Sequence, residues 1–239
     1  ANAVGMAMAE HHLAAKFGRD LVDHFTYVIA GDGCLMEGIS HEAASMAGHM
    51  GLSRLIVLFD DNGISIDGST DLAVSEDTTA RFEAYGWQVI EDVDGHDANA
   101  VAAAIGFAKE AGNRPSIICC KTQIGYGSPN KAGTAASHGA PLGEDEIAQT
   151  RKALGWESAP FEIPDEVYEG WDCRAKGAES ESAWQQQFNA YSGHFPDLAL
   201  EFERQMRGDL PGDWSDQMQA LLQKTDEAGK SIASRNASA

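Results

Sequence analysis

Short apolar runs alternate with helix-forming stretches through the first part of the chain, and this alternation constrains the fold more than any other feature. The runs cover residues 25–30, 55–59, 87–91 and 116–121. The first stops at Gly31 and the second at the turn-forming residues 60–63, which is typical of buried strands. Helix-forming stretches at residues 37–49 and 98–111 provide the crossovers that parallel strands require. The pattern therefore predicts an α/β fold with a doubly wound, mostly parallel sheet.

Helical patterns flank this predicted sheet in the sequence. Residues 3–17 are apolar on most faces and end at Gly18, which predicts a buried helix before the first strand. Beyond residue 143 the chain is polar, and predicted helices cover residues 144–154, 165–171, 179–191, 197–207 and 214–224. We predict an α/β domain over residues 1–154, a helical extension over 155–229 and a linker over 230–239. The first residue is Ala rather than Met, so we expect a piece of a longer chain whose first domain is incomplete and whose linker leads to a second domain.

The charge and cysteine content restrict the partners and the compartment. The chain has 17 Lys and Arg residues against 37 Asp and Glu residues, and its formal net charge is −20. This balance argues against nucleic acid and anionic membranes, because both attract cationic surfaces. The apolar runs are far shorter than the ~20 residues that span a bilayer, so we predict no membrane helix. Four cysteines without CxxC spacing favour a reducing, cytoplasmic location.

Polar residues follow the first two predicted strands, where parallel sheets bind their ligands. Asp32 lies between Gly31 and Gly33, and 28 residues separate Gly33 from Asn62. The two glycines would let a phosphate approach the backbone. Asp32 would repel that phosphate unless a cation lay between the carboxylate and the phosphate. Magnesium takes carboxylate, amide and carbonyl oxygens together with phosphate oxygens. Asp32, the Asn62 side chain and the Ile64 carbonyl therefore predict a diphosphate held through Mg²⁺.

Other phosphate and metal motifs do not fit these residues. A dinucleotide-binding GxGxxG would need glycine where Met36 stands, and a P-loop would need lysine where Ile39 stands. HExxH would need histidine where Ser45 stands, and a calcium loop would need glycine where Ser65 stands. Gly-Asp-Gly and Asn-Gly are each common in plain turns, and only their joint spacing favours a site.

A long glycine-rich segment follows the last predicted strand. Residues 122–143 contain five glycines and two prolines and show no periodicity. Structureless loops of this length in a compact domain are usually functional or disordered. His138 lies in this segment. His96 and Asp97 follow the predicted strand at residues 87–91. We therefore take His138 as a candidate functional histidine.

At these residues the chain resembles the diphosphate-binding domain of transketolases, which are thiamine-diphosphate enzymes. The family fingerprint is Gly-Asp-Gly followed some thirty residues later by Asn, as at residues 31–33 and Asn62. Further matches are RFEAYGW at 81–87, DGHD at 94–97, GSPNKAG at 127–133 and SHGAPLG at 137–143. The resemblance covers roughly residues 1–174. It implies the thiamine-diphosphate-binding fold, with thiamine diphosphate and Mg²⁺ as cofactors.

The resemblance also implies a role for each candidate residue. Asp32, Asn62 and the Ile64 carbonyl would hold Mg²⁺, while Gly33 and Asn62 would contact the diphosphate. Ile66 would pack beside the thiazolium, and His138, the candidate catalytic residue, would contact the cofactor and the donor sugar. Glu37 and Glu42 would lie near a dimer interface; a solvated helix face is the alternative for both.

The implied activity is transfer of a two-carbon ketol unit from a ketose phosphate to an aldose phosphate, in the pentose phosphate pathway. The partners would be sugar phosphates, the remaining transketolase domains and a homodimer partner. This chain would supply one wall of the site and would be inactive alone, because the family's glutamate that activates the aminopyrimidine lies in the second domain. The alternatives are a non-catalytic thiamine-diphosphate-binding or assembly module and a fragment of a dihydroxyacetone synthase.

Overall fold

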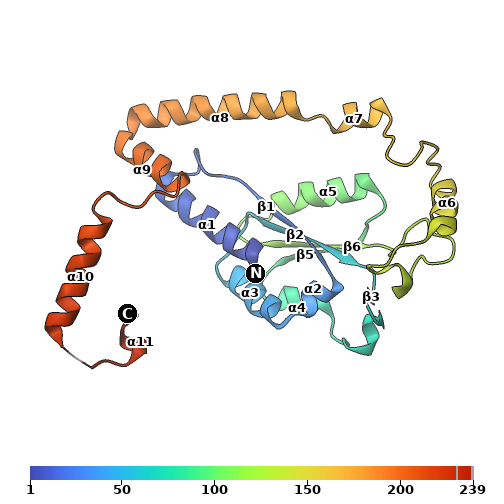
Figure 1. Ribbon diagram of the computed structural model, residues 1–239, viewed down its shortest axis with the longest axis horizontal. Helices are drawn as coiled ribbons and strands as arrows, with labels where there is room; N and C mark the ends of the chain where they lie inside the picture. Colours follow the sequence, from blue (N-terminus) through green and yellow to red (C-terminus); the bar gives the residue numbers. More distant parts are fainter. Residues whose placement is uncertain (230, 238–239) are drawn as a thin grey trace. The chain divides into compact units, whose positions relative to one another are not determined.

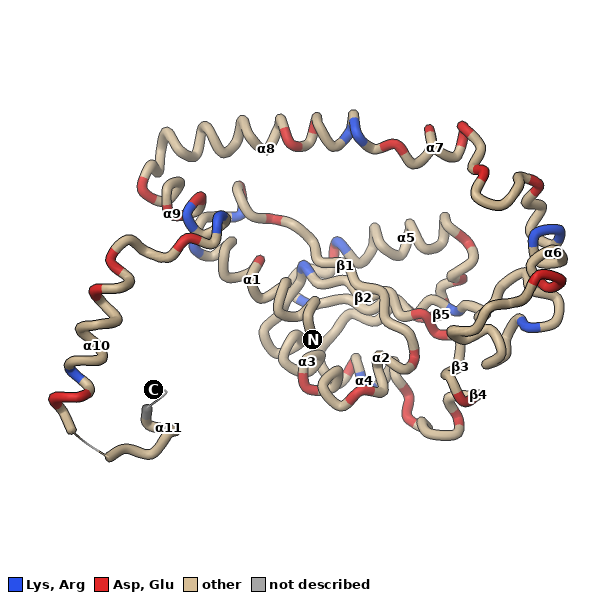
Figure 2. The backbone as a smooth tube through the Cα atoms, in the orientation of Figure 1, with Lys and Arg blue, Asp and Glu red and all other residues tan. Residues whose placement is uncertain are grey.

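The computed structural model describes residues 1–229 and 231–237, which form two compact units. The first unit is Ala1–Lys176 and the second is Gly177–Ala239. The domain division at residue 154 remains a prediction. Residues 230, 238 and 239 of the predicted linker lie outside the described residues, and a short helix, α11 (Ser234–Ala237), forms within it. Figure 2 shows that acidic residues are spread along both units of this chain, whose formal net charge is −20.

A four-stranded parallel sheet forms the centre of the first unit (Figure 1). Its order is β1 (Thr26–Gly31), β2 (Leu55–Asp61), β6 (Ser116–Lys121) and β5 (Gln88–Asp94). The chain moves from β1 to β2 in one direction and from β5 to β6 in the opposite direction. Right-handed crossovers in opposite directions place their helices on opposite faces. The predicted doubly wound α/β sheet is confirmed.

The two faces of the sheet carry separate cores. On one face, Leu55, Val57 and Phe59 of β2 pack with α1 (Asn2–Phe17), α3 (Gly38–His49) and α4 (Thr78–Ala84). On the other face, Ile56 of β2 and Ile118 of β6 pack with α5 (Ala98–Lys109). Alternate side chains of a central parallel strand are thus buried on both faces, which is why the sequence shows an unbroken apolar run there.

The edge strand β1 differs from the prediction of a fully buried strand. Ile29 is 78% exposed and Tyr27 is also exposed, because they lie on the face opposite Val28 and Ala30, where α5 packs mainly on β5 and β6. The first helix, α1, is buried along one face only, through residues such as Val4, Ala7 and Ala14, whereas Met6 is exposed. The sequence analysis did not predict α4.

Short elements connect these layers at the carboxyl ends of the strands. They are the helix α2 (Asp32–Met36), the antiparallel pair β3 (Ile64–Ser65) and β4 (Gly68–Ser69), and the 3₁₀ turns η1 (Thr70–Leu72) and η2 (Ala135–Ser137). Two predicted helices follow as α6 (Glu144–Ala153) and α7 (Asp165–Trp171). The predicted site residues lie in or beside these short elements. The four-stranded sheet and the long helices therefore position the predicted site residues but do not contain them.

The helical unit contains most of α8 (Arg174–His194), then α9 (Pro196–Met206) and α10 (Trp214–Ala228). Phe188 of α8 and Phe202 of α9 are buried with ring centroids 5.8 Å apart, and Trp184 stacks on Phe188 at 5.4 Å. All three helices were predicted, with ends that differ from the observed ends by at most five residues. Among the described residues, no helix is long and apolar enough to cross a membrane.

Candidate cofactor and metal site

The carboxyl ends of β1 and β2 bring Asp32 and Asn62 together. In the parallel register Gly31 lies opposite Asp60, so the residues that follow each strand meet at one edge of the sheet. The Asp32 Oδ2 atom accepts the backbone N–H groups of Asn62 at 3.3 Å and Gly63 at 3.2 Å. Neither of these two hydrogen bonds uses the Oδ1 atom. One carboxylate oxygen therefore anchors the turn while the other is available to a cation.

The Asn62 amide is fixed in orientation by its neighbours. Its Oδ1 atom accepts the Ile64 N–H at 3.0 Å, and its Nδ2 atom donates to Asp60 Oδ2 at 3.3 Å. Gly63 completes the turn with a φ of 69°, which is the left-handed region that glycine adopts without strain. The amide oxygen keeps a second lone pair, so it can ligate a metal without giving up the turn.

A cavity of about 650 Å³ contains five of the six predicted site residues. They are Asp32, Gly33, Asn62, Ile64 and His138. A Cβ atom at Gly31 or Gly33 would meet no atom within 4 Å, so no packing within the described chain requires these glycines. The open space above them fits a ligand group that approaches the backbone. The sixth residue, Ile66, is 72% exposed and does not line the cavity.

His138 brings an unpaired polar atom to the same cavity. Its Nδ1 atom is buried and has no hydrogen-bond partner in the described part of the protein. A buried polar group without a partner costs about 1–3 kcal/mol, and such groups call for an explanation. A bound ligand with a hydrogen-bonding atom at this place would remove the cost. The residues present therefore fit a polar ligand as well as a cation.

The local environment raises the pKa of the Asp32 carboxyl above its ordinary value of 3.8. Burial is the main cause, the N–H groups of Asn62 and Gly63 oppose it, and the charge of Asp61 adds to it. A carboxylate held in partial burial without a countercharge is destabilised. A divalent cation at Oδ1 would supply that countercharge.

The glycine-rich segment is tied to α6 by a buried carboxylate. Glu146 accepts hydrogen bonds from the Ser128 hydroxyl, from Asn130 N at 2.8 Å and from Asn130 Nδ2 at 2.9 Å. These hydrogen bonds lower the pKa of Glu146 to about 2, and the bond from Ser128 has the largest effect. Lys131 Nζ donates to the Leu142 carbonyl at 2.8 Å and connects the middle of the segment to its last residues. Polar contacts therefore connect the segment that carries His138 both to α6 and to itself.

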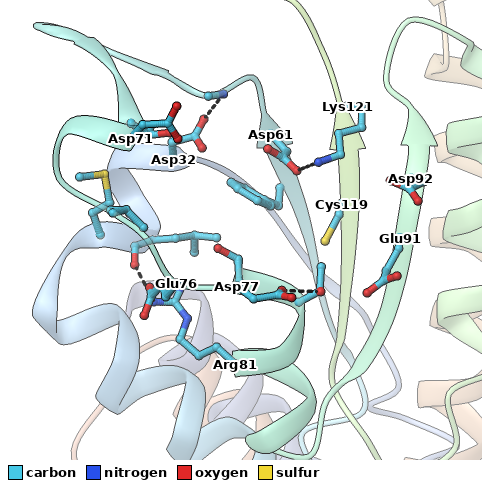
Figure 3. Close-up of a pocket in the computed structure, with 18 residues that line it drawn as sticks. Asp32, Asp61, Asp71, Glu76, Asp77, Arg81, Glu91, Asp92, Cys119 and Lys121 are labelled. Atoms are coloured by element: carbon cyan, nitrogen blue, oxygen red, sulfur yellow. Dashed lines mark hydrogen bonds and ion pairs between the residues drawn. The ribbon is translucent and has the colours of Figure 1, made fainter.

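A second cavity, of about 390 Å³, also reaches Asp32 (Figure 3). Its wall carries seven carboxylates: Asp32, Asp61, Asp71, Glu76, Asp77, Glu91 and Asp92. Its two cations are already paired, Lys121 with Asp61 at 2.5 Å and Arg81 with Glu76 at 2.5 Å. No group of three or more His, Cys, Asp or Glu side chains in the described ranges could hold a metal ion. The proposed Mg²⁺ site thus depends on amide and carbonyl oxygens beside Asp32.

Several residues of the first cavity were not assigned roles from the sequence. Asp60 accepts the Thr122 hydroxyl as well as the Asn62 amide, and so connects β2 to the glycine-rich segment. His96 and Gln123 also line the cavity. The sequence signals for His96 were its position after a predicted strand and its place in the DGHD motif at residues 94–97, and neither assigned it a role. Asp60 lay inside the expected turn, where its partner Thr122 could not be foreseen.

This parallel sheet, with polar groups converging at its carboxyl edge, defines an α/β ligand-binding domain. The family model described as "Transketolase, thiamine diphosphate binding domain" matches residues 1–211. The chain belongs to the transketolase family, and the resemblance inferred from its motifs is confirmed.

The similar proteins have much longer sequences than this chain. It is 58% identical to Transketolase 2 of Vibrio parahaemolyticus over 99% of this chain and 36% of that protein. It is 54% identical to Transketolase 1 of Escherichia coli over 100% of this chain and 36% of that protein. The chain thus spans about a third of the length of these relatives.

Solved structures agree with the fold. A Pichia stipitis transketolase in complex with sedoheptulose 7-phosphate matches with a TM-score of 0.85 and 42% identity, over 90% of this chain and 32% of that one. The transketolase of Leishmania mexicana matches with a TM-score of 0.84 and 43% identity, over 89% of this chain and 32% of that one.

Proposed function

We propose that this chain supplies the Mg²⁺- and diphosphate-binding wall of a transketolase. The observation that carries the proposal is the convergence, in one cavity, of the Asp32 carboxylate, the oriented Asn62 amide and the unpaired Nδ1 of His138. The Asp32 and Asn62 oxygens suit a cation beside a phosphate, and His138 Nδ1 suits a polar ligand atom. Membership of a thiamine-diphosphate-binding family supports the identity of the ligand.

Each residue has a defined part in this proposal. Asp32, the Asn62 side chain and the Ile64 carbonyl hold Mg²⁺, and Gly33 and Asn62 contact the diphosphate. When bound, thiamine diphosphate supplies the electron sink for transfer of a two-carbon unit between carbon chains. His138 orients the cofactor and donates or accepts a hydrogen bond at the donor sugar's oxygen. Ile66 packs beside the thiazolium once another surface covers it, which accounts for its exposure in this chain.

The complete reaction that we propose passes a ketol unit from a ketose phosphate to an aldose phosphate, in the pentose phosphate pathway of the cytoplasm. Its further partners are the remaining transketolase domains and a second subunit. Glu37 and Glu42 are exposed, which suits either a place near that interface or a solvated face. The chain alone is inactive, because no residue here corresponds to the family's glutamate for the aminopyrimidine. Positioning and preorganised electrostatics each supply several kcal/mol of catalysis, and a single wall lacks most of both.

Binding and turnover test the proposal separately. Titration calorimetry of the 239-residue chain with thiamine diphosphate should show binding with Mg²⁺ and none with EDTA. Asp71→Asn removes a carboxylate from the second cavity only and should leave this binding unchanged. Xylulose 5-phosphate and ribose 5-phosphate should yield sedoheptulose 7-phosphate only after the missing domains are added. Binding without turnover in that reconstituted mixture would favour a non-catalytic binding module, and Mg²⁺-independent binding would contradict the metal site.

A further inference from the structure

We propose that His96 is a positioning residue that holds the start of the glycine-rich segment, residues 122–143, at the end of β5 and thereby fixes His138 in the cavity. The inference rests on the proposed function, because it concerns the same cavity. His96, Gln123 and His138 all line that cavity, although they come from separate parts of the chain.

The imidazole of His96 makes two direct contacts with the segment. Its Nε2 atom accepts the Gln123 N–H at 2.9 Å, so the proton of the neutral ring is assigned to Nδ1. The ring also stacks on Tyr126, with centroids 3.9 Å apart and an interplanar angle of 19°. The backbone N–H of His96 donates to Asp94 Oδ1 at 2.9 Å, which fixes the turn that presents the ring.

The backbone before His96 is built for close approach to the same segment. Gly95 N donates to the Lys121 carbonyl at 2.9 Å. A Cβ atom at Gly95 would lie 2.4 Å from Thr122 Cγ2, which is too close for any side chain. The turn after β5 and the first residues of the segment therefore lie in direct contact, and His96 extends that contact to Gln123 and Tyr126.

Two further contacts connect the start of the segment, which His96 holds, to His138. The Ile124 carbonyl accepts the Gly133 N–H at 2.7 Å, which folds the segment back on itself. A Cβ atom at Gly125 would lie 2.8 Å from Ser137 Oγ, so Gly125 packs directly against the residue before His138. A displacement of Gln123 and its neighbours would consequently displace His138.

The contribution of His96 is local rather than global. His96 and Tyr126 are both exposed, and neither belongs to the two sheet cores. Substitution of His96 should therefore leave folding intact and alter only the segment. This exposure makes the inference testable without the risk that the variant fails to fold.

Two substitutions separate the hydrogen bond from the ring stack. His96→Gln places an amide oxygen within reach of the Gln123 N–H but removes the ring, whereas His96→Phe keeps a ring on Tyr126 but removes the acceptor. His24→Phe makes the same change at an exposed histidine that lines neither cavity. The readouts are hydrogen exchange at the Gln123 amide in the unliganded chain and calorimetric binding of thiamine diphosphate with Mg²⁺.

In His96→Phe we expect Gln123 exchange to accelerate about tenfold and the dissociation constant for thiamine diphosphate to rise about fivefold, as for one lost hydrogen bond. His96→Gln should restore both values to within about twofold of wild type. Unchanged Gln123 exchange in His96→Phe would overturn the inference. Restored exchange without restored affinity in His96→Gln would also overturn it, because the imidazole would then act on the ligand itself. Absence of binding by the wild-type chain would instead contradict the proposed function, so the two failures are distinguishable.

Discussion

Asp32→Asn should abolish Mg²⁺-dependent retention of thiamine diphosphate while leaving the fold of the chain intact. Both backbone hydrogen bonds to Asp32 end on the same oxygen, Oδ2. An amide oxygen in that place accepts both N–H groups. The amide NH2 group then occupies the position of Oδ1, and it cannot ligate a cation because it is a hydrogen-bond donor without an available lone pair. The substitution therefore removes the ligand and keeps the turn.

The stability change can be worked out from two opposing effects. The pKa of Asp32 is raised in the folded state, chiefly by burial, so the native state binds more protons than the unfolded state just above pH 3.8. Stability is accordingly lost as the pH rises through the window from 3.8 to the folded pKa, and the deficit persists at pH 7. Asn removes this deficit but weakens two hydrogen bonds by up to about 1 kcal/mol each, less solvent screening.

We therefore expect the free energy of unfolding of Asp32→Asn to lie within about 1 kcal/mol of wild type in the absence of Mg²⁺. Asp32→Ala removes the acceptor for two N–H groups and should cost about 1–3 kcal/mol. Urea unfolding measures both. Calorimetry with Mg²⁺ should show a loss of about 100-fold or more in cofactor affinity for Asp32→Asn, or about 2.7 kcal/mol. Wild-type affinity in Asp32→Asn, or a larger loss of stability for Asn than for Ala, would refute this reasoning.

Three further predictions address the supports of the site. The pKa of Glu146 is lowered to about 2, so the stability that its carboxylate contributes is complete above pH 4.5 and is lost toward pH 2. In urea unfolding, the difference in free energy of unfolding between wild type and Glu146→Gln should therefore shrink as the pH falls over that range. Gly95→Ala places a Cβ atom 2.4 Å from Thr122 Cγ2 and should destabilise by about 1–3 kcal/mol in urea, whereas Gly106→Ala, in open space on α5, should stabilise by about 0.5–1 kcal/mol. Ile117→Ala removes a side chain that is 0% exposed and should cost about 2–5 kcal/mol in chemical denaturation, while Ile39→Ala, 62% exposed, should change stability by less than about 0.5 kcal/mol. Equal effects within either matched pair would contradict the packing described here.

The strands and most helices were predictable because their apolar periodicity is set by burial, which leaves a local trace in the sequence. The strand at residues 116–121 and the helix at 165–171 match the prediction at both ends. Strand order left no such trace. The insertion of β6 between β2 and β5 depends on long-range packing, since every parallel order needs the same crossovers. Exposure of Tyr27 and Ile29 depends in the same way on tertiary packing, because α5 packs mainly on β5 and β6.

The predicted site also has a part that was predictable from the sequence and a part that depends on long-range contacts. Asp32 and Asn62 were expected to meet because they follow two strands joined by one crossover, and neighbouring parallel strands end at one edge. The proximity of His138 to them depends on a segment without periodicity, whose path is set by single contacts such as Glu146 to Asn130 and His96 to Gln123. Backbone N–H groups at both Asp32 and Glu146 determine the geometry, and every residue except proline carries one.

The polar and apolar parts of the proposed site differ in how completely this chain builds them. Hydrogen bonds within the chain already orient Asp32, Asn62 and the segment that carries His138. Ile66, the residue proposed to meet the apolar part of the cofactor, is 72% exposed on the β3–β4 turn. Burial of such a side chain is worth about 1.5–3 kcal/mol, but only when another surface covers it. We therefore expect this wall alone to hold the charged end of the ligand, whereas burial of the ring end should require a second surface.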